Sequence, residues 1–270
     1  MSILEGFKFK RTHSPIHTLD PRAKFLYVSV MFIITVLFTD LLPLIIVLLI
    51  QLVLIIKARI LKEWLRSVKG ATFLAIFILA STLISQFIYL GRVLTIQDYE
   101  YAISLAFRFI VLVTSFSLFF LTTSPDHLGL ALEQSGVPYS FCFAFTTAVR
   151  FVPVLAEEAK IIMDAQRSRG MELEKGNFIK KVKNYIPILI PLIVNALRRS
   201  LELAEAMESR AWGSQNKRTN LYYLELGQWD KILIVFSTLI MIISVYLKIL
   251  TIEGAVRIPQ LLPYIMTFLS

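Results

Sequence analysis

The sequence predicts an all-α, polytopic membrane protein with about five transmembrane helices, possibly six, and long amphipathic helices on the cytoplasmic side. Three observations predict this class: 56% of the 270 residues are apolar, only 17% are charged, and the mean hydropathy is +0.69. Soluble globular domains are less apolar and more charged. Intrinsic disorder is excluded because it requires low hydrophobicity, and a disulfide framework is excluded because Cys142 is the single cysteine.

Four spans are predicted in the N-terminal part of the chain. A helix needs about 20 apolar residues to cross the hydrocarbon core, and residues 71–90 form a stretch of that length without a charge. Residues 25–56 are apolar apart from one aspartate, and a turn at residues 39–43 would divide them into two short spans; one long tilted span is the alternative. The fourth span covers residues 103–123, and Arg108 in its first turns is expected to reach the lipid headgroups.

The C-terminal part is predicted to contain a fifth span over residues 232–247, which lie between two lysines. Residues 249–270 contain two prolines and two charges, so a sixth span, a re-entrant piece and an interfacial segment all stay open. We therefore divide the chain into residues 1–123, with the N-terminus and four spans, residues 124–230, and residues 231–270, with the last span and the tail.

The basic residues predict the orientation of the spans. Of the 28 Lys and Arg residues, 24 fall in residues 1–24, 57–70 and 124–231. Basic residues concentrate on the cytoplasmic side of membrane proteins, so the N-terminus and these segments are predicted to be cytoplasmic. This orientation is consistent only with two spans between residues 25 and 56. We do not expect a cleavable signal peptide, because no small-residue cleavage site follows the first apolar stretch.

The segment of residues 124–230 is predicted to form two long amphipathic helices. Apolar residues recur every three or four positions over residues 139–170 and again over residues 177–213. A shorter helix precedes them, capped by Ser124 or Asp126. Although the whole chain carries a net charge of +9, the acidic residues of this segment nearly balance its basic ones. A nucleic-acid partner is therefore not expected.

The two predicted amphipathic helices end alike, with arginines 41 positions apart. The two endings are Ser168-Arg169-Gly170 and Ser209-Arg210-Ala211. One interpretation is helix termination, since a cation suits the last turn of a helix and a small residue supplies a left-handed cap. The other is that each arginine binds carboxylates or carbonyls on a soluble partner, and the repeat would suit a partner with two similar subunits.

Three parts of the chain match the pattern of one family. They are residues 14–24, which read SPIHTLDPRAK, the passage of residues 121–153, and the two arginine triplets. Together they resemble the transmembrane T component of energy-coupling factor transporters, the family that includes the permease subunit of cobalt importers. Many members have Ala where this chain has Ser168, and Gly where it has Ala211; both departures keep a small residue.

The resemblance implies a non-catalytic subunit of an ATP-driven importer, without a cofactor or metal of its own. Such a subunit joins two cytoplasmic ABC-type ATPases, identical or different, to a small membrane protein, the S component, that captures a vitamin or a cobalt or nickel ion. The resemblance assigns ATPase binding to the triplets Ser168, Arg169, Gly170 and Ser209, Arg210, Ala211. Closure of the ATPases on ATP would then move the two amphipathic helices.

Two other functions compete with this interpretation. An intramembrane enzyme acting on a lipid would use charges such as Glu157, Glu158, Arg150 and Arg198, and a conventional ABC permease would have one coupling loop. The spans contain few ionisable groups and the arginine ending is doubled, which favours the coupling subunit. On this interpretation Glu157 and Glu158 are solvated residues of a helix.

Two further patterns are set aside. His13 and His17 have the spacing of metal ligands on one helical face, but Pro15 between them argues against a helix. The sequence has no Gly-x-x-x-x-Gly-Lys motif, so a nucleotide-binding loop is not expected in this chain.

Overall fold

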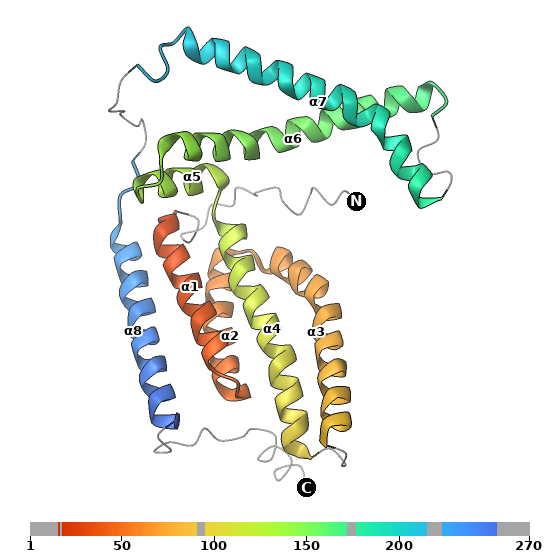
Figure 1. Ribbon diagram of the computed structural model, residues 1–270. Coiled ribbons are helices and arrows are strands. Elements are labelled where there is room, and N and C mark those ends of the chain that lie inside the picture. The colour runs from red at the N-terminus through yellow and green to blue at the C-terminus, as the bar shows by residue number, and fades with distance from the viewer. Residues whose placement is uncertain (1–15, 17, 91–94, 172–176, 215–222, 253–270) are drawn as a thin grey trace. The chain divides into compact units, whose positions relative to one another are not determined.

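Eight α-helices make up the described part of the chain (Figure 1). The computed structural model describes residues 16, 18–90, 95–171, 177–214 and 223–252. The chain divides into two compact units, Met1–Ala131 with Leu224–Ser270, and Leu132–Tyr223. The tail after residue 252, where a sixth span is one alternative, and the His13 and His17 pair lie outside the described residues.

The first unit contains five long helices. They are α1 Pro21–Leu37, α2 Leu41–Ala58, α3 Leu61–Leu90, α4 Ile96–Thr122 and α8 Gln228–Ile252. Helix α4 contacts α1, α2 and α3, and α8 returns from the far end of the sequence to pack on α1. Tyr27, Met31, Ile55 and Val111 are fully buried between these helices. The core therefore forms where α1, α2 and α4 meet.

The predicted turn between the first two spans is confirmed. Helix α1 begins at Pro21 after Asp20, whose Oδ1 accepts a hydrogen bond from the Arg22 backbone N–H at 2.8 Å. Helix α1 ends at Leu37, and α2 begins at Leu41. Pro43 lies in the first turn of α2, where its missing N–H has no partner to lose. The alternative of one long tilted helix is wrong.

Arg108 makes three contacts that its position in the sequence does not predict. Its Nε donates to the Thr35 carbonyl at 2.9 Å, and its Nη2 donates to the carbonyls of Val36 at 2.8 Å and Phe38 at 2.7 Å. The last carbonyls of a helix have no intrahelical donor. The guanidinium on α4 therefore caps the end of α1.

Five helices are long and apolar enough to cross a membrane by length and composition: α2, α3, α4, α8 and the 30-residue helix α6, Tyr139–Ser168. The number agrees with the prediction, but the members differ. Helix α1 has 17 residues and is only about 25 Å long at 1.5 Å per residue. Helix α6 meets the criterion although its pattern predicts an interfacial helix. Helices α3 and α8 also begin earlier than predicted, because charged residues continue each helix past its apolar stretch.

The second unit is formed by α6 and α7 Phe178–Glu208, which cross each other (Figure 1). Both predicted amphipathic helices are confirmed to within a few residues. The short helix α5 Pro125–Gln134 precedes them in the chain. Ser124 Oγ accepts the His127 backbone N–H at 3.3 Å, so Ser124 is the cap of α5, as predicted.

Candidate functional site

Helix α6 ends in a left-handed cap formed by the first arginine triplet. Gly170 has φ +82°, and the Met171 N–H donates to the Gln166 carbonyl at 3.1 Å. This long bond around a left-handed residue is the Schellman ending of a helix. The Ser168 hydroxyl donates to the Asp164 carbonyl at 3.0 Å. Arg169 is exposed at the tip.

Helix α7 ends in the same way at the second triplet. Ala211 has φ +56°, and the Trp212 N–H donates to the Met207 carbonyl at 3.0 Å. The Ser209 hydroxyl donates to the Ala206 carbonyl at 3.0 Å, and Arg210 is exposed. The two triplets therefore agree in backbone conformation as well as in sequence.

The small left-handed residue of each triplet and the backbone bonds around it account for helix termination. In the described residues, neither Arg169 nor Arg210 has a side-chain hydrogen bond or ion pair that would take part in the cap. The left-handed residue and the backbone bonds are sufficient for a Schellman ending. The exposed guanidinium forks are thus available to a carboxylate or carbonyl of another molecule.

The two tips lie at opposite ends of α6. Trp212, two residues after Arg210, packs on the first turns of α6, with its ring centroid 5.3 Å from that of Tyr139 and 4.6 Å from that of Phe143. Arg169 follows the last turn of the same helix. Thirty residues at 1.5 Å each give about 45 Å between these two places.

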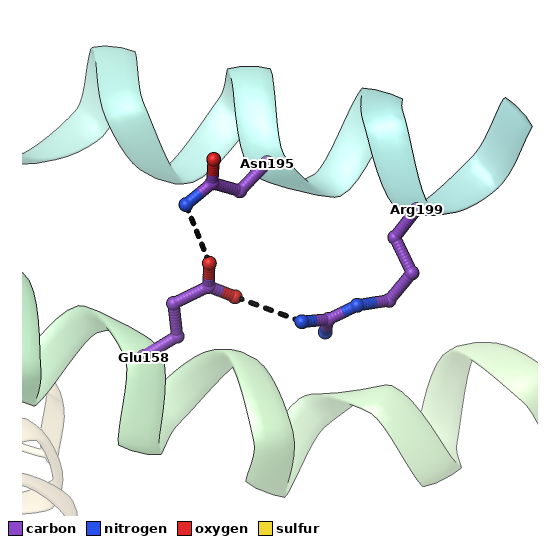
Figure 2. Close-up of polar contacts among 3 residues, drawn as sticks. All are labelled: Glu158, Asn195 and Arg199. Atoms are coloured by element: carbon purple, nitrogen blue, oxygen red, sulfur yellow. Dashed lines mark hydrogen bonds and ion pairs between the residues drawn. The ribbon is translucent and has the colours of Figure 1, made fainter. Parts of the chain in front are cut away.

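A polar contact joins α6 and α7 where they cross (Figure 2). Asn195 Nδ2 donates to Glu158 Oε1 at 2.6 Å, and Arg199 Nη2 lies 3.3 Å from Glu158 Oε2. The guanidinium of Arg199 also lies over the Phe151 ring, 5.9 Å from its centroid. The expectation that Glu158 is solvated is wrong, since its side chain is only 19% exposed. Glu157 is exposed, as predicted.

Of the charged residues that the alternative of an intramembrane enzyme would use, only Glu158 takes part in this contact. Glu158 pairs with Arg199, which sequence reasoning did not single out, whereas Glu157 and Arg198 are exposed residues. A signal for it was present, because Asn195 interrupts an apolar run over residues 186–197 and Arg199 follows one turn later.

A second group that sequence reasoning missed lies in the first unit, where α1, α4 and α8 meet. The Asp20 backbone N–H donates to Asp230 Oδ1 at 2.8 Å, and the Gly227 N–H donates to Asp230 Oδ2 at 2.9 Å. Lys24 Nζ donates to the Thr122 carbonyl at 2.9 Å. Lys24 therefore caps the end of α4, just before the chain continues into α5. Asp20 and Lys24 belong to the segment SPIHTLDPRAK, for which this gives a structural role.

Known proteins that are similar to this chain belong to one family of transport proteins. Residues 12–221 match the family model described as CbiQ, cobalt transport protein. The chain is similar to three proteins named energy-coupling factor transporter transmembrane protein EcfT. That of Ruminiclostridium cellulolyticum is 30% identical over 86% of this chain and 94% of the relative. That of Acidaminococcus fermentans is 35% identical over 81% of this chain and 87% of the relative. That of Staphylococcus aureus is 30% identical over 90% of this chain and 95% of the relative.

Proposed function

This chain belongs to the family of EcfT- and CbiQ-like energy-coupling transmembrane components of transporters, and from that premise we propose that it joins two cytoplasmic ABC-type ATPases to a small membrane protein that binds the transported substrate. The chain hydrolyses no ATP itself in this proposal; the partner subunits do. The cargo is a vitamin or a cobalt or nickel ion, recognised by the substrate-binding S component.

The observation that carries the proposal is the pair of matching tips. Each presents one exposed arginine immediately before the left-handed residue of its cap, and the two tips lie about 45 Å apart, the length of α6. Two equal sites at that separation suit two similar subunits, each with a groove lined by carboxylates or backbone carbonyls. A guanidinium fork makes two parallel hydrogen bonds to such groups, which a lysine does not.

The apolar side of α7 supports a role for this unit in contacting the membrane or the S component. Ile186, Leu189, Ile193, Leu197 and Leu201 are all exposed along α7. Contiguous exposed apolar surface of this kind marks membrane or protein contact sites. Closure of the ATPases on ATP would displace the tips, and the stiff helices would carry that displacement to the apolar surface, where the S component would tilt or be released.

The test is co-purification in mild detergent from the native host, with the retained chains identified by mass spectrometry. We expect two ABC-type ATPases with the native chain, weaker retention in Arg169→Glu and in Arg210→Glu, and none in the double variant. Arg167→Glu is the matched control, because it reverses a charge two residues from the first tip and its side chain is also exposed. A folded double variant that retains both ATPases would overturn the proposal, as would a native chain that retains none.

A further inference from the structure

The crossing of α6 and α7 is held by one carboxylate that receives two donors. Asn195 and Arg199 are four residues apart, so they project from the same side of α7. Each donates to a different oxygen of Glu158, at 2.6 Å and 3.3 Å (Figure 2). Arg199 is held against α6 a second time by the ring of Phe151. This arrangement fixes both the position along each helix and the direction of approach.

Apolar contacts alone would fix neither the position along each helix nor the direction in which the helices approach each other. Burial of apolar surface is non-directional, so two helices with apolar faces can slide and rotate at small cost. Hydrogen bonds are directional, and the Glu158 and Arg199 side chains are only 19% and 35% exposed. A shift of one helix by a turn would leave partly buried charges without their partners, which is unfavourable.

Prolines place a weakened turn beside this contact in both helices. Pro153 lies five residues before Glu158 in α6, and Pro187 and Pro191 lie before Asn195 in α7. A proline within a helix removes one backbone hydrogen bond and clashes with the preceding turn, so helices bend there. The helices can therefore bend next to the crossing, and the polar contact opposes a shift of the crossing point.

We propose that Glu158 is a positioning residue: with Asn195 and Arg199 it fixes how α6 and α7 cross and thereby, together with the packing of Trp212 on the first turns of α6, sets the separation of the Arg169 and Arg210 tips. The consequence for ATPase binding rests on the function proposed above, because only a tip separation that matches two grooves would seat both ATPases at once. The crossing itself does not depend on that function.

The test measures the tip separation directly by pulsed electron spin resonance. Spin labels are attached to Ser168→Cys and Ser209→Cys, both exposed, in a Cys142→Ser background of the full chain in lipid nanodiscs. We expect one narrow distance distribution in this background and a roughly twofold broader or shifted one in Glu158→Ala, because the bent helices lose their fixed crossing. Glu157→Ala, which removes the exposed neighbouring carboxylate, is the matched control and should leave the distribution unchanged.

Rescue separates positioning from general loss of folding. The charge swap Glu158→Arg with Arg199→Glu should narrow the distribution again in part, because it re-forms the ion pair but loses the contact of Arg199 with the Phe151 ring. Glu158→Gln, which keeps an oxygen for Asn195, should broaden the distribution less than Glu158→Ala. Helix content by circular dichroism should be equal in all variants. If Glu158→Ala fails to fold, Glu158→Gln and the swap decide the matter in its place. An unchanged distribution in Glu158→Ala, or a swap that broadens it further, would overturn the proposal.

ATPase retention distinguishes this proposal from the function on which its consequence rests. With both tips intact, Glu158→Ala should retain ATPases about tenfold more weakly, as expected when two sites no longer bind together, and the swap should restore retention in part. A native chain that retains no ATPase, but whose tip separation responds to Glu158→Ala, would remove the coupling function and leave the positioning role of Glu158 standing.

Discussion

The left-handed residue at each tip allows a quantitative test with one methyl group added or removed. Ala211 has φ +56°, a conformation that costs an L-residue about 1 kcal/mol and glycine almost nothing. Gly170 holds the same place at the other tip with φ +82°, and a Cβ there would meet nothing within 4 Å. The two sites therefore isolate the backbone cost from any steric cost.

Ala211→Gly should stabilise the end of α7, and Gly170→Ala should destabilise the end of α6, each by about 1 kcal/mol, or about fivefold in the population of the open cap. Amide hydrogen exchange followed by mass spectrometry measures this population. The reporting amides are those of Trp212 and Met171, which donate the long bonds to the carbonyls of Met207 and Gln166. Exchange should slow about fivefold at Trp212 in the first variant and accelerate about fivefold at Met171 in the second.

Ala206→Gly provides the control of opposite sign. Ala206 lies five residues earlier in the same helix, inside α7, where glycine costs about 1 kcal/mol relative to alanine. Replacing alanine by glycine should therefore accelerate amide exchange near the end of α7 when it is made at position 206, and slow it when it is made at position 211. Faster exchange in Ala211→Gly as well would refute the argument that a left-handed residue ends this helix.

Three contacts in the first unit are tested by substitution and thermal unfolding in detergent. Arg108→Gln should lower stability by about 2 kcal/mol, since three carbonyls at the end of α1 lose a charged donor; an unchanged melting temperature would show that other groups satisfy them. Asp230→Asn should cost about 2 kcal/mol, because the amide sets an N–H against one of two backbone donors, whereas exposed Glu225→Gln should be neutral. Ser115→Ala should cost about 1 kcal/mol by removing the acceptor of the buried Gln51 amide, and Gln51→Leu should cost less, since it removes both polar atoms; the reverse order would contradict this asymmetry.

The class of the protein and the long helices could be predicted because they depend on local periodicity. An apolar stretch of about 20 residues and an amphipathic repeat are each complete within one segment of sequence. The two arginine triplets were equally local, since a small residue just after a helix signals a left-handed cap. Predicted helix ends failed where a helix continues through charged residues, as at the start of α3 at Leu61, because charge excludes a segment from the bilayer and not from a helix.

The partners of charged residues could not be predicted in the same way. Arg108 looked like a residue that reaches the lipid headgroups, and Glu158 looked like a solvated one. In the structure, both have partners on another helix. Arg108 donates to a carbonyl at the end of α1, 70 residues away in the sequence, and Glu158 accepts a hydrogen bond from Asn195 on α7, 37 residues away. Periodicity gives the side of a helix on which a residue lies, but it does not say which other helix faces that side.

The sequence by itself determined that this protein is an all-α membrane component of the EcfT and CbiQ family, with two amphipathic helices that end in matching arginine triplets. Only the tertiary structure decided that α8 packs on α1, that Arg108 and Lys24 cap other helices, and that Glu158 holds the crossing of α6 and α7. The physical reason is the distance along the chain over which each interaction acts. Helix formation and apolar periodicity act within a few turns, whereas the partner of a half-buried charge is set by which distant segments pack together.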